Sequence, residues 1–428
     1  MNKQPASLNI ETLPGPQDIA RKELENGIVI LVRPNFNTLS VSLAGYLPAG
    51  SLYEPEEKLG LADFTASGLM RGTQQRSFQE IYNSLESIGA SLRFSGGTHT
   101  SGFSGKALAD DLDILTEILK QSLLNPTFPS QQVERIRSQQ LTGLDLRAQD
   151  TGDMASLVFD QLAYQNHPYR HPGDGFPETI AAITRRDLLD FHSRQYGPRG
   201  MVISVSGAVQ PERVFQLIED TLGSWDNPDQ PEEITVPPAP DISETIKRHH
   251  TIPEKSQADL VLGAPGPSRC SPDFIPARLG NNILGQFGMM GRIGDAVRSK
   301  AGLAYYAYSS VSSSIGPGPW TVSAGVNPAD LDRALDLIIQ EIEAYVSQPV
   351  TGEELGNSKS SYIGKLPLAL ESNAGVASAL LNLERYGLGL DYYQNYQAMI
   401  NQVSAEEILE VSRKYLDPDR LAVATAGP

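Results

Sequence analysis

The stretch from Gly280 to Ser314, GNNILGQFGMMGRIGDAVRSKAGLAYYAYSSVSSS, decides how we interpret the rest of the chain. Its first part resembles a loop because glycines interrupt it repeatedly, and its second part changes from helical spacing to the alternation of a strand. We therefore expect a loop, a short helix, a turn and a strand in that order. The interrupting glycines are Gly285, Gly288, Gly291 and Gly294.

The helical part of this stretch runs from Arg292 to Lys300, with its apolar residues spaced for one side and Arg298 pointing away from it. Gly302 is expected to end the helix. The residues after it alternate, with Tyr305 on one face of a predicted strand. The turn between helix and strand should therefore bring Arg298 and Tyr305 near one another.

An arginine and a tyrosine in this arrangement have a useful chemistry. Arginine offers a rigid fork of donors and tyrosine offers one hydroxyl, so together they are suited to hold the carbonyl oxygens of an extended peptide or a developing oxyanion. The ordinary interpretation of such a pair is a solvated charge and a core ring, and spacing alone favours that interpretation.

The run ILGQFGMMGRIGDAVRSKAGLAYYAYSS resembles the Arg/Tyr segment of the pitrilysin/insulinase-like zinc peptidase superfamily, in its mitochondrial processing peptidase-like branch. The resemblance assigns the substrate-binding pair to Arg298 and Tyr305. It leaves open whether Tyr306 or Tyr308 takes the tyrosine's role. It also implies substrate binding by the glycine loop, at Gly285, Gly288 and Gly291.

The same resemblance points to a missing metal site in the first half of the chain. Active members carry an inverted H-x-x-E-H motif, whose histidines bind zinc and whose glutamate acts as the general base. This chain has GLADFTASGLMRGT at residues 60–73, with Asp63 and Ser67 at the histidine positions and Ala66 at the glutamate position. A catalytic zinc needs three protein ligands. We therefore expect no metal in this chain.

Other metal ligands are equally scarce in the sequence. The family's third ligand is a glutamate in a helix corresponding to QQLTGLDLRAQD, where Leu144 stands at the expected position and only Asp145 is a possible substitute. Prolines make the segment around His167 and His171 a turn. His249 and His250 are adjacent, so they point different ways in a strand.

Composition excludes several classes of protein. The formal net charge is −17, and no block of Lys and Arg offsets it, which argues against nucleic acid and is compatible with basic peptides as ligands. The single Cys270 excludes an internal disulfide. We find neither a signal-peptide pattern nor an apolar stretch long enough to span a membrane, and we expect a cytoplasmic protein.

The order of predicted elements repeats after a proline-rich linker. Thr184-x-x-Asp187 corresponds to Ser404-x-x-Glu407, about 220 residues later in the chain. MVISVSGA from Met201 corresponds in the same way to LAVATAGP from Leu421. We predict an α+β fold of two similar domains, each a mainly antiparallel sheet with helices packed on one face. The predicted domains are residues 1–225 and 246–428, joined by a linker at residues 226–245.

Taken together, the resemblance implies the non-zinc subunit of a heterodimeric zinc endopeptidase. This chain would bind and orient unfolded peptides, and a homologous H-x-x-E-H partner would hold zinc and cleave them. A peptide would add as a strand to a sheet edge. Two alternatives stay open. One is a non-proteolytic scaffold of a larger complex, and the other is a single-chain peptidase with a non-standard metal site, which the missing base at position 66 disfavours.

Overall fold

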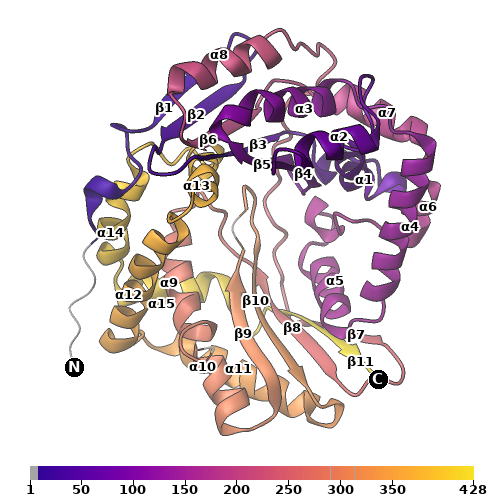
Figure 1. Ribbon diagram of the computed structural model, residues 1–428. Coiled ribbons are helices and arrows are strands. Elements are labelled where there is room, and N and C mark those ends of the chain that lie inside the picture. Colours follow the sequence, from indigo (N-terminus) through magenta and orange to yellow (C-terminus); the bar gives the residue numbers. More distant parts are fainter. Residues whose placement is uncertain (1–7, 290, 313) are drawn as a thin grey trace.

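The computed structural model describes residues 8–289, 291–312 and 314–428, which form two β-sheets surrounded by helices (Figure 1). The first sheet lies at the top of the figure and the second at the bottom. The predicted α+β class and the predicted duplication are both confirmed.

The first sheet has six strands in the order β1-β2-β6-β3-β5-β4. β2 and β6 are parallel, and every other neighbouring pair is antiparallel. β1 and β4 are the two edge strands. The strands are β1 (Ala20–Glu23), β2 (Val29–Pro34), β3 (Ser40–Leu47), β4 (Ser91–Gly96), β5 (Ser101–Leu108) and β6 (Val202–Gly207).

The second sheet repeats this order without a counterpart of β1, as β7-β11-β8-β10-β9. β7 and β11 form its parallel pair, as β2 and β6 do in the first sheet. Gly207 and Gly427 end the equivalent strands β6 and β11, both with positive φ, and a side chain at Gly207 would collide with the carbonyl oxygen of Ser40. The strands are β7 (Ile246–Thr251), β8 (Ala258–Pro265), β9 (Ala304–Val311), β10 (Pro319–Val326) and β11 (Ala422–Gly427).

The helices of each half, apart from one exchanged helix in each, cover the outer face of its own sheet, and each sheet has a large apolar core beneath them. In the first half they are α1 (Leu61–Gly68), α2 (Phe78–Glu86), α3 (Leu112–Leu124), α4 (Ser130–Arg147), α5 (Thr151–Ala163), α6 (Pro177–Ala182), α7 (Arg185–Gln195) and α8 (Pro211–Leu222). In the second half they are α9 (Phe274–Gly285), α10 (Gly291–Ile293), α11 (Leu331–Ser347), α12 (Gly352–Ala369), α13 (Asn373–Arg385), α14 (Tyr392–Gln402) and α15 (Ala405–Tyr415).

Two helices at equivalent places in the halves are exchanged. α5 of the first half packs on β8 and β11 of the second sheet, and α13 of the second half packs on β3 and β6 of the first sheet (Figure 1). Ala155 and Phe159 of α5 share a buried cluster with Ala424 of β11. The Ser204 hydroxyl of β6 donates to the Ala377 carbonyl of α13 over 2.7 Å. Each sheet therefore has its second face partly covered by the other half.

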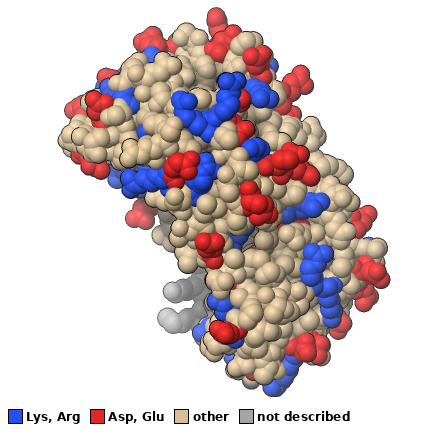
Figure 2. Space-filling view, turned by 90° about the vertical axis from the view of Figure 1, so that its right-hand side faces the viewer, with Lys and Arg blue, Asp and Glu red and all other residues tan. Residues whose placement is uncertain are grey.

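The proline-rich segment between the halves, residues 223–245, contains no helix or strand. Its boundaries as a linker stay a prediction. Within the ranges that the structure describes, no helix combines the length and the apolar character needed to cross a bilayer. Figure 2 shows both signs of charge interspersed over one side of the molecule. The acidic balance of the chain is thus not gathered into one field on that side.

Candidate functional site

The helix that carries the altered zinc motif is α1, and it lies against the edge strand β4. Gly96 of β4 has no room for a side chain, because a Cβ there would lie 2.5 Å from the Cα of Asp63. Asp63 itself accepts a hydrogen bond from the Gln140 amide of α4 over 3.1 Å. Burial raises the pKa of the Asp63 carboxyl, although Gln140 and the backbone amide of Gly96 oppose that shift.

The other two motif positions offer little to a metal. Ala66 is buried, with 1% of its surface exposed, and has no group that could act as a base. Ser67 is half-buried on the same helix. Among the described residues, no three His, Cys, Asp or Glu side chains gather as a metal site would require. The residues present at Asp63, Ala66 and Ser67 do not fit zinc.

The structure corrects our view of the third position. Leu144 is buried and Asp145 is exposed, whereas Gln140, one helical turn earlier, is the residue that faces Asp63. Gln140 and Leu144 share a face of α4 because they are four residues apart. This four-residue spacing could have pointed from Leu144 to Gln140, but the sequence prediction named only Leu144 and Asp145.

The half-buried carboxylate of Glu54 binds the start of α1. Glu54 accepts hydrogen bonds from the backbone amides of Gly60, over 2.9 Å, and Ala62, over 2.5 Å. Burial raises the pKa of Glu54 to about 7, and these two hydrogen bonds oppose the shift. Amides at a helix N-terminus have no partner within the helix, so Glu54 supplies one. Sequence reasoning missed this residue.

The glycine loop between α9 and α10 combines packing with exposure. Gly285 is buried at the end of α9, and a side chain there would collide with the backbone nitrogen of Ser309 in β9. Gly288 is exposed with a φ of +62°, and Gly291 turns with a φ of +67°. Phe287 and Met289 are exposed beside Gly288. Met290, the next residue of the loop, lies outside the described residues.

Arg298 lies in a π-helical segment, Gly294–Lys300, rather than in a regular α-helix. The backbone amide of Ala301 donates to the Ala296 carbonyl over 3.2 Å, which is the wider i→i+5 spacing of such a segment. Ile293 and Val297 are buried as the helical spacing predicted. Among described residues, the Arg298 guanidinium has no ion pair and no hydrogen bond.

The three neighbouring tyrosines of β9 have different surroundings. Tyr305 falls at a β-bulge, where Ala304 pairs with Val326 and Tyr306 pairs with Gly325, so Tyr305 has no cross-strand partner. Its side chain is 67% exposed. A bulge redirects a side chain relative to a regular strand. The regular alternation predicted for this strand is therefore interrupted at Tyr305.

The hydroxyl of Tyr306 forms an internal hydrogen bond. Its hydroxyl donates to the Asp259 carboxylate of β8 over 2.5 Å, and Asp259 is 1% exposed. Thr151 of α5 also donates to Asp259, as does the Gln257 amide over 2.9 Å. Burial, followed by the hydrogen bond to Asp259, raises the pKa of Tyr306. Tyr306 thus connects β9 to the exchanged helix α5, whereas Tyr308 is 39% exposed.

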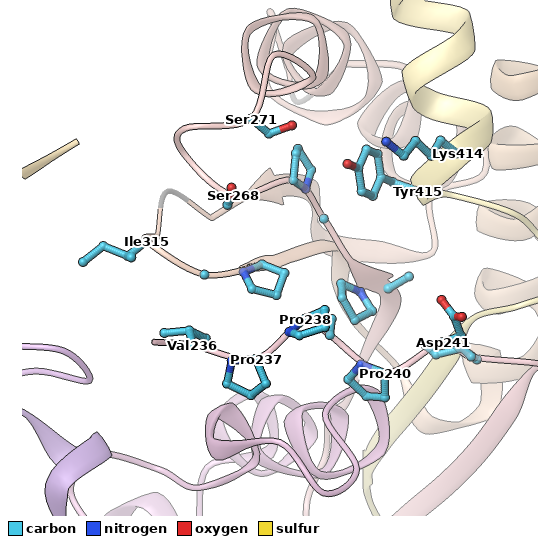
Figure 3. Close-up of a pocket in the computed structure, with 18 of the residues that line it drawn as sticks. Val236, Pro237, Pro238, Pro240, Asp241, Ser268, Ser271, Ile315, Lys414 and Tyr415 are labelled. Atoms are coloured by element: carbon cyan, nitrogen blue, oxygen red, sulfur yellow. The ribbon is translucent and has the colours of Figure 1, made fainter. Parts of the chain in front are cut away.

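A cavity of about 900 Å³ lies away from both of these places (Figure 3). The linker forms one wall with Val236, Pro237 and Pro238, and Tyr415 and Lys414 lie across the cavity from them. Lys414 and Tyr415 both donate to Asp273, over 2.7 and 2.9 Å. Their polar groups are therefore already engaged, and the cavity contains none of the predicted site residues.

Two family models match this chain. Residues 29–170 match the model described as insulinase (peptidase family M16), and residues 182–362 match the model described as the peptidase M16 inactive domain. The chain belongs to the pitrilysin/insulinase-like peptidase superfamily. The superfamily resemblance of the Gly280–Ser314 stretch is thereby confirmed.

Relatives of this superfamily member match it over nearly its whole length. The uncharacterized zinc protease YmxG of Bacillus subtilis is 25% identical over 412 residues, covering 96% of this chain and 98% of YmxG. The mitochondrial-processing peptidase subunit beta of Bos taurus is 26% identical, covering 95% of this chain and 83% of the subunit. A crystal structure of a peptidase M16 inactive domain from Pseudomonas fluorescens has the same fold, with a TM-score of 0.88, 24% identity and coverage of 96% and 98% of the two chains.

Proposed function

We propose that this chain is the non-zinc subunit of a two-chain zinc endopeptidase. It binds and orients an unfolded peptide through Arg298 and Tyr305, and a homologous partner with an intact H-x-x-E-H motif cleaves the peptide. The chain alone has no peptidase activity in this proposal. Zinc belongs to the partner.

The observation that carries the proposal is a contrast between two segments of one chain. At α1 the positions of two metal ligands and a base are occupied by Asp63, Ser67 and Ala66, and Asp63 is bound to Gln140. At the other segment both members of the Arg/Tyr pair are present. Tyr305 is exposed at a bulge, and Arg298 has no partner among the described residues. Side chains whose polar groups form no hydrogen bond with the described residues are available to a ligand.

The chemistry of the pair suits a peptide backbone. The guanidinium presents several donors in one plane, and the phenol adds a single donor that can approach from another direction. Donors placed in advance around a carbonyl oxygen stabilise the negative charge that grows on it during amide cleavage. Arg298 and Tyr305 would therefore orient the peptide and support the oxyanion, without transferring a proton themselves.

A two-chain enzyme is supported by the relatives. The bovine relative is by name one subunit of a processing peptidase. The strands β4 and β9 lie at sheet edges, where an extended peptide can add as a strand. In β4 the backbone amide of Gly96 is already bound to Asp63. Recognition of that kind depends mainly on main-chain hydrogen bonds, which agrees with unfolded peptides as substrates.

The proposal is tested by expressing the chain with and without an H-x-x-E-H homologue, and measuring zinc content and cleavage of an unstructured fluorogenic peptide. We expect activity only from the pair, and zinc only when the homologue is present. Arg298→Ala should lower turnover of the pair on the order of 100-fold, the usual cost of losing one oxyanion donor. Arg194→Ala, an exposed arginine on α7, is the matched control and should retain full activity.

The outcomes separate the alternatives. Full activity of both Arg298→Ala and Tyr305→Phe in a pair that still assembles would refute the peptide-binding role and favour a scaffold. Zinc in stoichiometric amount and cleavage by the chain alone would refute the division of labour between the two subunits. Loss of activity in Tyr308→Phe with none in Tyr305→Phe would move the tyrosine's role to Tyr308.

A further inference from the structure

A polar pocket of about 340 Å³ lies between the exchanged helix α13 and the edge hairpin β4–β5. Its volume falls within the range of about 300–1,000 Å³ that is usual for ligand sites. The helix α13 lies on the side of the first sheet that is turned toward the second sheet (Figure 1). Backbone of the glycine-rich turn at Gly96 and Gly97 forms one wall, and Ser378, Asn382 and Arg385 of α13 form the other.

The charged group of this pocket is Arg385, the last residue of α13, and it has no acidic partner. No described carboxylate lies within 4.0 Å of its guanidinium, and its buried Nε has no hydrogen-bond partner among described residues. The adjacent Glu384 is engaged elsewhere, because it pairs with Arg21 over 2.7 Å. The guanidinium lies 5.4 Å from the ring centre of Tyr46 and 5.8 Å from that of Tyr386. Flanking rings of this kind favour a cation and fix its place.

The remaining polar groups of the pocket are also free. Within the described ranges, the side chains of Ser95, Thr98, Thr100, Ser378 and Asn382 form no hydrogen bond with the protein. Four of these are hydroxyls and one is an amide, and each can donate. A pocket in which several donors surround an unpaired guanidinium is complementary to an anion with two oxygen atoms in one plane.

The wall around the pocket has the same sign of charge. On β4 and β5, the alternation that exposes Ser95 also exposes Arg93 and Lys106, and no Asp or Glu lies in either strand. The nearby His99 is neutral, because burial and then Arg385 lower its pKa to about 4. The strand side of this inner wall is thus cationic in a chain whose net charge is −17, whereas burial raises the pKa of Tyr46 and the nearby carboxylates of Glu384 and Glu233 raise it further. Local charge therefore argues for acidic ligands here, although the net charge alone is compatible with basic peptides.

We propose that the pocket at Arg385 binds a carboxylate of the peptide that this chain holds. The inference rests on the proposed peptide-binding function and names a second contact for the same ligand. The carboxylate is either the peptide's C-terminal group or an Asp or Glu side chain. The guanidinium of Arg385 donates hydrogen bonds to both oxygens of the carboxylate, and the neighbouring hydroxyls donate further hydrogen bonds to them.

The test is fluorescence anisotropy of the full-length chain with three short, labelled peptides of Gly, Ser and Ala. One has a free C-terminus, one is amidated, and one is amidated with an internal Glu. We expect at least one carboxylate-bearing peptide to bind about ten-fold more tightly than the amidated peptide, as for one charge-assisted hydrogen bond. Which of the two binds more tightly identifies the source of the carboxylate.

The variants decide the role of Arg385. Arg385→Gln should abolish the ten-fold preference and leave binding of the amidated peptide unchanged, and Arg385→Lys should retain part of the preference. Arg194→Gln removes the same charge from the outer surface of α7 and should change nothing. Melting curves of all variants identify any that fail to fold, in which case Arg385→Lys alone decides.

Failure of this inference can be told from failure of the proposed function. Equal binding of the three peptides to the wild-type chain, or a preference that survives Arg385→Gln, overturns the carboxylate pocket. Weaker binding of every peptide to Arg298→Ala, with the preference intact, supports both contacts. If no peptide binds the wild-type chain at all, the pocket proposal is overturned as well. The proposed function is then tested separately, by the cleavage assay of the reconstituted pair.

Discussion

Tyr305 and Tyr306 are adjacent in sequence but should respond in opposite ways to loss of the hydroxyl. Tyr305 is exposed at a bulge, and Tyr306 donates to the buried Asp259. Tyr→Phe at each position removes one oxygen atom and keeps the ring. The pair of substitutions therefore separates a group that serves a ligand from a group that serves the fold.

The expected magnitudes follow from these surroundings. A hydrogen bond to a charged acceptor contributes about 1.5–3 kcal/mol, so Tyr306→Phe should lower the free energy of unfolding by that amount. The loss is at the upper end of this range if the remaining donors, Thr151 and Gln257, cannot move to replace the phenol. Tyr305→Phe removes an exposed hydroxyl, so it should change stability by less than about 0.5 kcal/mol. In the reconstituted pair it should lower turnover on the order of 100-fold.

The assay combines urea unfolding, followed by circular dichroism, with cleavage of a fluorogenic peptide by the pair. Tyr306→Phe should shift the unfolding midpoint and, at a temperature where it is folded, keep activity within a few-fold of wild type. Tyr305→Phe should show the reverse. If Tyr305→Phe is the destabilised variant, or Tyr306→Phe loses activity while fully folded, the assignment of roles to the two hydroxyls is refuted.

Further predictions concern the glycine loop and two buried titratable groups. Gly285→Ala forces α9 away from Ser309 and should cost about 1–3 kcal/mol of stability. Gly288→Ala meets no atom of the described residues within 4 Å, and its left-handed backbone costs only about 1 kcal/mol. Thermal melts of the two variants compare these costs. Burial raises the pKa of Glu54 to about 7, well above the ordinary value of about 4.5, so the wild type should lose stability relative to Glu54→Gln as pH rises from about 4.5 to 7. Burial lowers the pKa of His192 to about 4, so the wild type should lose stability relative to His192→Gln as pH falls from about 6.5 to 4. Urea midpoints across this pH range check both signs, and parallel curves for variant and wild type would contradict them.

Local signals in the sequence were sufficient where a few neighbouring residues determine the structure. Ser77 and Thr184 begin helices α2 and α7 as capping boxes, and Ser404 does the same for α15. Each box is complete within four residues, so the pattern needs no tertiary information. The duplication was visible for a similar reason, because Gly207 and Gly427 end equivalent strands in which a side chain has no room.

Features that depend on packing between distant segments were not predicted. The apolar stripe of α5 indicates burial, but the stripe is the same whichever sheet covers it, so the exchange of α5 and α13 left no sign in the sequence. The bulge at Tyr305 depends on how β9 pairs with β10, whereas strand alternation assumes a regular ladder. Arg385 was overlooked because a single arginine at the end of a helix is commonplace until its missing partner is seen.

The exchanged helices connect the two proposed contacts with the peptide. α13 ends in Arg385 beside the first sheet, and α5 begins at Thr151, which donates to Asp259 of β8. The same carboxylate accepts from Tyr306, the neighbour of Tyr305 in β9. Each helix belongs by chain connection to one half and by packing to the other, so a rotation of one half against the other would expose apolar surface on both sheets. The distance between the cationic wall and the Arg/Tyr segment is therefore fixed by the fold of this chain. Under the proposed function, a peptide that binds at both contacts would have to span this separation, which this chain sets without any partner.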